Sequence, residues 1–465
     1  MSRVETLIDR CRAAGQGHVL AHWDGLRPEQ QANLLAQLDG LDFELLKTLQ
    51  GLVRQGVPTA SSQTFVAPDV FPLLRDDTRQ REATSAVLEG ERLQAEGKVG
   101  FVLVAGGQGS RLGYDGPKGC FEVGPLSGRT LFGWHAARLL AGRARYGGGG
   151  PWYIMTSATN DAATRAFFEE QEFFGMDPDD VFFFTQRMLP ALDLEGRILL
   201  SAPDSLFLAP NGHGGTLEAL AHSGALAHAS ARGVELLSYF QVDSPVARPT
   251  DPLFLGLHSL ASAQMSSKVV KKRSADEKVG VLGLVDGALG CIEYSDLPGD
   301  LRGATAPNGE LLFHAGNIAN HILNVEFVEQ LTSSGLNLPW HVARKTMQVF
   351  DPKVGQRECD GVKFETFVFD ALGQSDNSVT LEVDRRTEFS PVKNAAGSDS
   401  PQSCRADMAN TFAEWVVAAG GDLPAQGPDG FPLIEVDPRV AECRQEFLDL
   451  WPLQAEDLGG GQLYS

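Results

Sequence analysis

Residues 101–123 contain the residues of this chain that are best suited to phosphate chemistry. The apolar run from Phe101 to Ala105 predicts a buried strand, and the glycine-rich loop Gly106–Gly109 follows it directly. Glycine lets backbone N–H groups approach a ligand closely, because no Cβ lies in the way. Arg111 and Lys118 come next and add positive charge. A glycine loop at a strand end, followed by cations, favours the binding of a nucleoside triphosphate.

The spacing of this segment excludes two common phosphate loops. A Walker A loop needs lysine between glycine and Ser or Thr, whereas Lys118 follows Pro117 and precedes Gly119. The dinucleotide pattern GxGxxG needs a third glycine where this chain has Leu112. The sequence therefore supports neither a P-loop ATPase nor an NAD-dependent oxidoreductase.

Three further segments carry charge that phosphate chemistry could use. Asp243 follows the apolar strand predicted at 235–242, and one carboxylate with substrate phosphates and water is sufficient to hold Mg²⁺. The alternative is a capping or solvated aspartate. Lys393 precedes a predicted flexible linker, 394–403, and suits a phosphate anchor that closes on substrate, the alternative being a surface lysine. We interpret the run Lys268–Arg273 as a solvated basic face.

Three polar segments suit the recognition of a base and a sugar. A second glycine turn, at 210–215, precedes a predicted helix and can press its backbone against a base or ribose, although an ordinary surface turn has the same composition. Gln186 follows a phenylalanine-rich strand and could read the edge of a base with its amide. Asn317 is surrounded by small residues at 313–321 and could hydrogen-bond to a sugar.

The elements that must position these residues change in character at residue 99. Residues 1–98 have helical periodicity, with a Pro/Ser/Gln-rich connection at 58–72. A helix at 78–96 ends this part. From residue 99 the hydrophobic pattern predicts strands at 101–105, 152–156, 181–184 and 235–242, and helices at 131–141, 161–174 and 216–230. This alternation predicts an α/β fold with a mostly parallel sheet and helices on both faces. Ligands of such sheets bind beyond the carboxyl ends of the strands.

Length and composition predict three domains. They are a helical N-terminal domain at 1–98, a catalytic domain at 99–384 and a small C-terminal domain at 385–465, with a loose tail opened by Gly459–Gly461. The formal net charge of −21 argues against nucleic-acid and anionic-membrane partners. The chain has no apolar run that could span a bilayer, no secretory signal at its start, and six scattered cysteines without a CxxC pair. We therefore expect a reduced, cytoplasmic protein.

Several motifs, in this order, resemble the eukaryotic-type UDP-N-acetylhexosamine pyrophosphorylases within the UDP-sugar pyrophosphorylase family. The resemblance covers about residues 14–406. It rests on Gly-Gly-Gln-Gly-Ser-Arg-Leu-Gly from 106, Pro-Lys-Gly from 117, Met-Leu-Pro-Ala from 188, Val-Asp from 242, Glu-Tyr-Ser from 293, Ala-Gly-Asn-Ile-Ala-Asn-His from 315, Phe-Val-Phe-Asp from 367 and Phe-Ser-Pro-Val-Lys-Asn from 389. It implies a Rossmann-like, nucleotidyltransferase type A-like fold. The implied reaction converts UTP and a sugar 1-phosphate to UDP-sugar and pyrophosphate.

The resemblance also implies a role for each matching residue. The triphosphate and the leaving pyrophosphate would be held by Gly106, Gly107, Gln108, Gly109, Arg111 and Lys118. Uracil would be contacted by Gln186 and Gly212, and Mg²⁺ would be bound by Asp243. The sugar pocket would be lined by Gly280, Glu293, Asn317 and Phe369. The transferred or sugar phosphate would be held by Lys393.

One position departs from the acetylhexosamine pattern. These enzymes usually have asparagine where this chain has His213, and Gly212-His213-Gly214 is more similar to UDP-glucose or broad-range UDP-sugar enzymes. The preferred sugar 1-phosphate therefore remains open between N-acetylglucosamine, glucose and several sugars. A non-catalytic nucleotide-sugar-binding protein on the same fold is a lower alternative, because the charged site residues are all present. The sequence does not indicate an oligomeric state.

Overall fold

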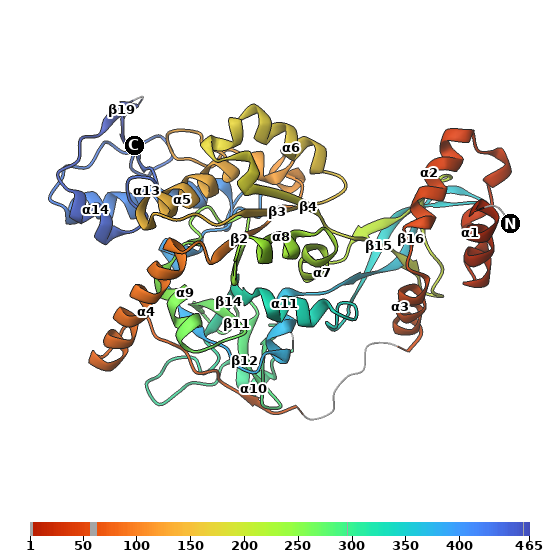
Figure 1. Cartoon of the computed structure of the whole chain (residues 1–465), viewed down its shortest axis with the longest axis horizontal. Coiled ribbons are helices and arrows are strands. Elements are labelled where there is room, and N and C mark those ends of the chain that lie inside the picture. Colours follow the sequence, from red (N-terminus) through yellow and green to blue (C-terminus); the bar gives the residue numbers. More distant parts are fainter. Residues whose placement is uncertain (1–2, 56–62, 295, 459) are drawn as a thin grey trace. The chain divides into compact units, whose positions relative to one another are not determined.

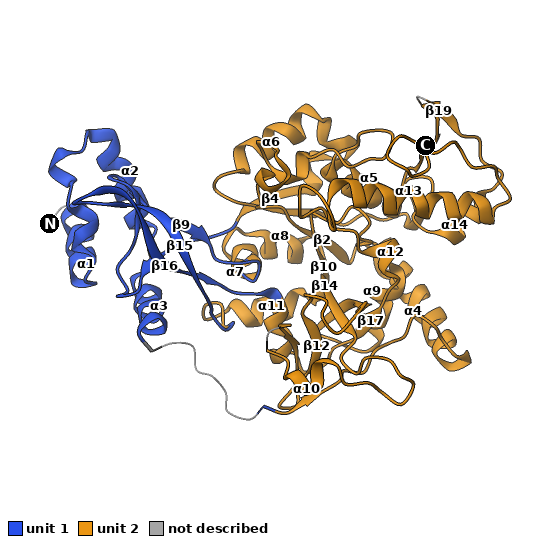
Figure 2. Cartoon of the chain, turned by 180° about the vertical axis from the view of Figure 1, so that it is seen from behind, with its two compact units in different colours: residues 1–63, 186–215, 338–368 blue, residues 64–185, 216–337, 369–465 orange. Residues whose placement is uncertain are grey.

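The computed structural model describes residues 3–55, 63–294, 296–458 and 460–465, and they fall into two compact units. Unit 1 combines Met1–Gln63, Gln186–Gly215 and Leu338–Val368. Unit 2 combines Thr64–Thr185, Thr216–Asn337 and Phe369–Ser465 (Figure 2). Each unit is therefore assembled from three separate stretches of chain.

Unit 1 packs three helices against a five-stranded sheet. Its helices are α1 (Arg3–Ala13), α2 (Pro28–Asp39) and α3 (Phe43–Gln55). The sheet order is β6-β16-β15-β7-β8, formed by β6 (Leu192–Asp193), β7 (Leu200–Ala202), β8 (Ser205–Leu206), β15 (His341–Asp351) and β16 (Gly355–Glu365). A separate pair joins β5 (Met188–Pro190) and β9 (Leu208–Pro210).

The α3 helix shows why these residues form this unit. Its buried side chains are Phe43, Leu46, Leu49 and Val53, a helical spacing that presents one apolar face. Asp42 precedes the helix and accepts hydrogen bonds from the backbone N–H groups of Glu44 and Leu45. The apolar face joins a core that also contains residues of α1, α2, β6 and β16.

Unit 2 is built around a ten-stranded sheet, with the main order β1-β12-β14-β10-β2-β3-β4. Its strands are β1 (Phe65–Val66), β2 (Val99–Val104), β3 (Trp152–Thr156), β4 (Val181–Thr185), β10 (Leu236–Gln241), β11 (Met265–Lys271), β12 (Val281–Val285), β13 (Ala288–Ile292), β14 (Ala315–Asn324) and β17 (Thr380–Glu382). Strands β10, β2, β3 and β4 pair in parallel, whereas β14 pairs with β10 in the antiparallel direction. A small sheet near the C-terminus joins β18 (Ile434–Val436), β20 (Gly461–Tyr464) and β19 (Glu456–Leu458).

Helices cover both faces of the parallel strands. The helices are α4 (Asp77–Ala95), α5 (Leu131–Tyr146), α6 (Asp161–Glu170), α7 (Gly215–His222), α8 (Ala225–Ala231), α9 (Pro252–Leu260), α10 (Gly299–Arg302), α11 (Val325–Thr332), α12 (Arg385–Glu388), α13 (Pro401–Ala418) and α14 (Arg444–Leu450). Figure 1 shows α6 and α8 on opposite sides of β4. The expected α/β fold with a parallel sheet at its centre is thus confirmed, and the predicted strands between residues 101 and 242 are present. The helix expected at 216–230 is divided into α7 and α8, because Gly224 has a φ of +85°, and the one expected at 161–174 ends at Glu170.

The division into compact units differs from the three domains expected from sequence. Helix α4 lies within the predicted N-terminal domain, 1–98, but it packs on α9 in unit 2. A Cβ on Gly90 would lie 1.9 Å from the backbone oxygen of Pro252, and one on Gly256 would lie 1.7 Å from that of Ala86. The two helices therefore cross at a distance that only glycine allows.

The segment 385–465 also shares the core of unit 2 instead of standing apart. Helix α13 buries Met408, Phe412 and Trp415. The ring of Phe412 stacks on that of Trp134 in α5, with centroids 6.4 Å apart. One continuous core therefore joins this segment to the catalytic domain that the sequence predicted.

Two segments predicted to be loose are ordered. In the segment 394–403, Ser400 caps α13 by accepting a hydrogen bond from the N–H of Ser403, so the expected linker is a turn and a helix start. Residues 461–464 form β20 between two neighbouring strands. Residues 58–62 of the expected connection and Gly459 of the expected tail lie outside the described residues. Among the helices that the structure describes, none has the length and apolar character needed to cross a membrane.

Candidate active site

The glycine loop leaves β2 and folds back on itself. The N–H of Lys118 donates to the carbonyl oxygen of Gly107 at 3.1 Å. The buried amide of Asn160, at the start of α6, donates to the carbonyl oxygens of Ala105 and Gly107 at 2.9 and 3.2 Å. The loop is therefore fixed at its base by a side chain from the next βα unit. Sequence analysis missed Asn160, whose position before the acidic first turn of a helix was the available signal.

Glycine occurs at the positions of this loop for different structural reasons. A Cβ on Gly119 would lie 2.2 Å from the ring of fully buried Phe132, so glycine is required for the turn beside Lys118 to pack. A Cβ on Gly109 would lie 2.8 Å from the side chain of Tyr114. By contrast, a Cβ on Gly107 would meet no atom within 4 Å. The space beside Gly107 is open, as a loop that receives a ligand requires.

Lys118 and Asp243 are brought together at the carboxyl ends of β2 and β10. The ammonium nitrogen of Lys118 lies 3.4 Å from Oδ2 of Asp243, and the side chains are 16% and 18% exposed. The backbone of Asp243 accepts a hydrogen bond from the N–H of Val392 at 2.8 Å. Lys393, which is exposed, follows Val392 directly in the sequence and is therefore brought near Asp243 by this contact. Arg111 lies in a short 3₁₀ turn, Ser110–Leu112, and is exposed.

Within the described chain, no group of three His, Cys, Asp or Glu side chains is arranged to hold a metal ion. A metal site at this edge would therefore depend on Asp243 together with oxygen atoms of a ligand and of water. Such a donor set suits Mg²⁺, which retains several waters and is often held by one or two carboxylates with substrate phosphates.

In unit 1, the glycine turn at 210–215 is packed tightly, and α7 follows it as predicted. Gly212 has a φ of +79°, and a Cβ there would lie 2.4 Å from the carbonyl oxygen of Thr366. That oxygen also accepts a hydrogen bond from the N–H of Gly214. Buried Gln186 donates from its amide to Oδ1 of Asn211 at 3.0 Å and to the carbonyl oxygen of Gly212 at 2.5 Å. The structure thus brings the two predicted uracil residues, Gln186 and Gly212, into direct contact.

His213 is held by contacts within unit 1. Its Nδ1 accepts a hydrogen bond from the N–H of Val368 at 3.2 Å, and its ring stacks on Phe367 with centroids 5.1 Å apart. Burial, with a smaller contribution from His341, lowers the pKa of His213 to about 4. The imidazole is therefore neutral at physiological pH, with its proton on Nε2.

Three of the predicted sugar-pocket residues lie around one cysteine in unit 2. The backbone N–H of Asn317 donates to the carbonyl oxygen of Gly280 at 2.9 Å. The amide of Asn317 donates to Sγ of Cys291 at 3.7 Å, and a Cβ on Gly280 would lie 2.8 Å from that sulfur and 3.9 Å from Glu293. Burial and Glu293 raise the pKa of the Cys291 thiol, so it stays protonated. Cys291 was not among the residues predicted from the sequence. The fourth predicted sugar-pocket residue, Phe369, is buried in a separate 3₁₀ helix, Val368–Gln374.

A β-bulge orients Asn317. The pairing of β14 with β11 shifts register opposite Lys268 and Val269, and Ala319 has a φ of +55°. The N–H of Ala319 donates to Oδ1 of Asn317 at 3.0 Å, which stabilises this unusual backbone. Bulges of this kind re-aim a side chain next to a functional site.

The interpretation of Lys268–Arg273 as a solvated basic face is wrong for Lys268 and Lys272, both of which are buried. The side chain of Lys268 is only 1% exposed, and its ammonium lies 2.8 Å from Oδ2 of Asp251 and 2.5 Å from Oε2 of Glu388. The position of the strand explains the error: β11 pairs with β14 and β17 and is buried from Met265 to Val270, so that only its last residue, Lys271, is exposed. Glu388 ends α12 just before the segment that carries Lys393, so this buried charge cluster anchors that segment.

The fold and the comparisons with known proteins place this molecule among the nucleotidyltransferase enzymes. A sequence profile for the family described as UTP–glucose-1-phosphate uridylyltransferase matches residues 47–403. UDP-N-acetylhexosamine pyrophosphorylase-like protein 1 of Homo sapiens is 36% identical over 95% of this chain and 93% of the relative. UDP-N-acetylglucosamine pyrophosphorylase of Saccharomyces cerevisiae is 32% identical over 92% and 93%.

Solved structures show the same similarity. That of the uridine diphosphate N-acetylglucosamine pyrophosphorylase from Trypanosoma brucei superimposes with a TM-score of 0.80 at 26% identity, covering 97% of this chain and 95% of that one. A UDP-glucose phosphorylase from the same organism has a TM-score of 0.61 at 18% identity, covering 93% and 87%, and shows the shared fold. The chain belongs to the UTP–glucose-1-phosphate uridylyltransferase family, as its motifs indicated, and it is a UDP-sugar pyrophosphorylase.

Proposed function

We propose that this enzyme transfers uridylate from UTP to N-acetylglucosamine 1-phosphate, giving UDP-N-acetylglucosamine and pyrophosphate. The observation that carries the proposal is the similarity, over more than nine-tenths of the chain, to relatives named for this sugar nucleotide. The lower alternative of a non-catalytic binding protein is disfavoured by the charged residues at the carboxyl edge of the sheet.

The reaction needs positioning and charge neutralisation more than covalent chemistry from the protein. An oxygen of the sugar phosphate attacks the α-phosphorus of UTP, the bond between that phosphorus and the bridging oxygen breaks, and pyrophosphate leaves with the electron pair. Arg111, Lys118 and the backbone of the glycine loop would neutralise and orient the triphosphate. Lys393 would hold the sugar phosphate. The attacking phosphate is already ionised at neutral pH, so no general base is required.

Mg²⁺ is proposed as the cofactor, with Asp243 as its protein ligand. A single carboxylate that is partly exposed and placed at the strand ends fits an ion that takes its remaining ligands from phosphates and water. When bound, Mg²⁺ supplies charge neutralisation at the α-phosphate. The role of the chain is to hold the Asp243 carboxylate in place, through its pairing with Lys118 and the backbone contact with Val392.

We extend the proposal to the fold type of the catalytic unit and to the cellular location of the protein. The parallel strands with a glycine loop after β2 support a Rossmann-like, nucleotidyltransferase type A-like catalytic unit. All six cysteines are free thiols, and three of them are buried. Reduced cysteines support a cytoplasmic location.

A second candidate is a UDP-glucose or broad-range UDP-sugar pyrophosphorylase, favoured by the histidine in the Gly-His-Gly turn. A panel of sugar 1-phosphates, from glucose to N-acetylglucosamine and N-acetylgalactosamine, assayed with UTP and Mg²⁺ for pyrophosphate release, distinguishes the two. We expect N-acetylglucosamine 1-phosphate to give the highest kcat/KM. A preference for glucose 1-phosphate would favour the second candidate. If none of the sugar 1-phosphates tested led to the release of pyrophosphate, both candidates would be refuted.

A further inference from the structure

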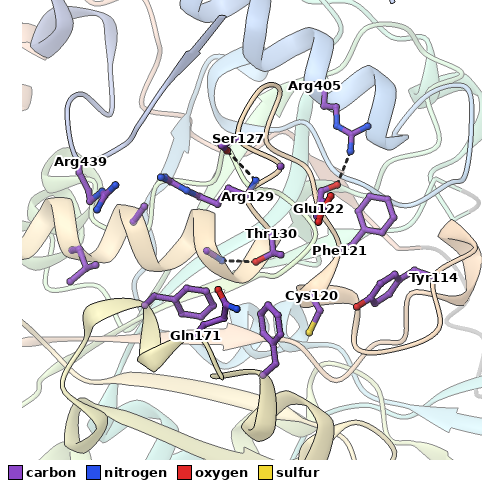
Figure 3. Close-up of a pocket in the computed structure, with 16 residues that line it drawn as sticks. Tyr114, Cys120, Phe121, Glu122, Ser127, Arg129, Thr130, Gln171, Arg405 and Arg439 are labelled. Carbon is purple, nitrogen blue, oxygen red and sulfur yellow. Dashed lines mark hydrogen bonds between the residues drawn. The ribbon is translucent and has the colours of Figure 1, made fainter. Parts of the chain in front are cut away.

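A cavity lies in unit 2, in front of the N-terminus of α5, and Figure 3 shows its lining. Its volume is about 870 Å³, within the range of small-molecule binding sites. The residues to which we assign UTP, sugar and metal do not line it. The cavity is therefore distinct from the substrate site proposed above.

The lining of this cavity is positively charged in a chain that is strongly acidic overall. It includes Arg129, Arg405 and Arg439, against the single carboxylate of Glu122, whereas the whole chain carries a formal net charge of −21. Figure 3 shows Arg405 and Arg439 on either side of the loop that carries Arg129. An arginine cluster maintained against the global charge favours an anionic ligand, because guanidinium groups match phosphate and carboxylate geometry.

A buried carboxylate fixes two of these arginines in place. Arg129 and Arg439 both pair with Asp437, a fully buried carboxylate behind the cavity wall. Burial would raise the pKa of Asp437, but these two arginines lower it, so the carboxylate stays ionised and fixes both guanidinium groups. Nη1 of Arg129 is nevertheless buried without a hydrogen-bond partner among the described residues. The guanidinium group also lies over the ring of Trp134, 5.3 Å from its centroid, which fixes its orientation further.

The rest of the cavity is aromatic. Tyr114, Phe121, Phe167 and Phe174 contribute to its lining, and each is only partly buried against the core. Rings left partly uncovered in a cavity favour the stacking of a flat ligand group. The cavity thus has an anion-binding side and an aromatic side.

We propose that this cavity is a second ligand site, for an organic phosphate that carries a flat ring, such as a nucleotide. The phosphate would bind to Arg129, Arg405 and Arg439, and the ring would lie against the aromatic wall. This binding does not depend on the proposed substrate or reaction.

The cavity shares its wall with the phosphate loop, so a ligand there would influence the substrate site. The N–H of Tyr114 donates to the carbonyl oxygen of Gly109 at 3.2 Å, and the N–H of Phe121 donates to that of Lys118 at 3.0 Å. Each of these residues touches the cavity on one side and the phosphate loop on the other. We therefore expect an occupant to change the KM for UTP, an expectation that does rest on the proposed function.

Binding of ATP, measured by isothermal titration calorimetry on the full chain, tests the site. We expect the Arg405→Ala/Arg439→Ala variant to weaken ATP binding by at least about tenfold, because two charge-assisted contacts are lost. The matched control removes two exposed arginines of the same C-terminal segment that do not line the cavity, Arg386→Ala/Arg444→Ala, and should leave binding unchanged. Thermal unfolding of both variants checks that they remain folded.

Three outcomes would overturn parts of the proposal. If ATP does not bind at millimolar concentration, or binds the cavity variant as tightly as the unmodified enzyme, the cavity is not the site, since ATP held in the substrate site would be unaffected by these changes. If inorganic triphosphate binds as tightly as ATP, the aromatic wall has no role. If ATP binds the cavity while the KM for UTP stays constant, the coupling to the phosphate loop is refuted and the site stands without it.

Discussion

The ammonium group of Lys118 lies 3.4 Å from a carboxylate oxygen of Asp243, although the two residues come from different βα units of the sheet. The first is the lysine assigned to the triphosphate and the second is the carboxylate assigned to Mg²⁺. Their proximity means that the proposed phosphate and metal functions share one point at the ends of β2 and β10. Each group also sets the local charge that the other experiences.

Replacement of Lys118 by alanine should lower kcat/KM for pyrophosphate release by on the order of 10³–10⁵, by analogy with other cations that neutralise charge in phosphoryl transfer. The measurement is a steady-state assay with UTP, sugar 1-phosphate and Mg²⁺. Lys353→Ala, at an exposed hairpin of unit 1, is the control and should retain full activity. Full turnover by Lys118→Ala would contradict the role given to this lysine.

Replacement of Lys268 by methionine should destabilise the protein by about 3–5 kcal/mol, because Asp251 and Glu388 would be left as buried carboxylates without their cation. Denaturant unfolding measures the change. Lys271→Met is the matched control on the same strand, since Lys271 forms an exposed pair with Glu310 that contributes less than about 1 kcal/mol. Equal losses for the two variants would show that burial of Lys268 has no energetic consequence.

Replacement of Gly90 by alanine should destabilise unit 2 by about 1–3 kcal/mol, since the added Cβ would lie 1.9 Å from the backbone oxygen of Pro252 and would force α4 away from α9. Gly51→Ala is the control, because Gly51 lies inside α3 and a Cβ there meets no atom within 4 Å. That change should stabilise by about 0.5–1 kcal/mol. Thermal or denaturant unfolding distinguishes the expected destabilisation by Gly90→Ala from the expected stabilisation by Gly51→Ala.

Stability should fall as the pH is lowered from 6.5 to 4, partly because of His135. Burial lowers the pKa of this histidine from 6.5 to about 4, so the unfolded chain binds a proton in this range that the folded protein does not. Unfolding therefore becomes more favourable with falling pH, by up to about 1.4 kcal/mol per pH unit for one group. His135→Gln should reduce the slope of unfolding free energy against pH by up to about 1.4 kcal/mol per pH unit, the contribution of one proton. Denaturant unfolding across this pH range measures the slope. An unchanged slope would show that His135 does not titrate in this way.

Replacement of His213 by asparagine should change the ratio of kcat/KM between N-acetylglucosamine 1-phosphate and glucose 1-phosphate by less than about threefold, or about 0.7 kcal/mol. The reason is that the imidazole is engaged by Val368 and Phe367 within unit 1. The same variant should lose about 1 kcal/mol of stability, because this hydrogen bond and the ring stacking are disrupted. A tenfold shift in the sugar ratio would instead identify His213 as a determinant of sugar preference.

The sequence predicted the central part of unit 2 well, for a physical reason. Buried parallel strands such as β2 and β3 are continuous apolar runs, and the helices between them have clear periodicity, so local pattern and tertiary structure agree. The glycine loop, Asp243 and the turn at 210–215 follow from where those strands end. These features need no information about distant residues.

Other parts of the site depend on contacts that the local pattern does not contain. Lys268 is buried because two carboxylates from distant segments neutralise it, so its charge alone suggested an exposed face. Asn160 acts through its two hydrogen bonds to the phosphate loop, and Cys291 through its contact with Asn317. Predicting them would require knowledge of the pairing of β12 with β13 and β14 and of the contact between α6 and the loop.

Unit 1 carries a consequence for how the protein is made. Its core combines Leu34 and Leu38 from the first segment with Leu192 and with Val362, which lies in the last. The first helices therefore leave the ribosome long before the strands that cover their apolar faces. Unit 1 can close only after residue 368 has been synthesised, whereas β2, β3 and β4 of unit 2 can already pair. During translation, the N-terminal segment must remain soluble with its apolar faces uncovered while much of the other unit is produced.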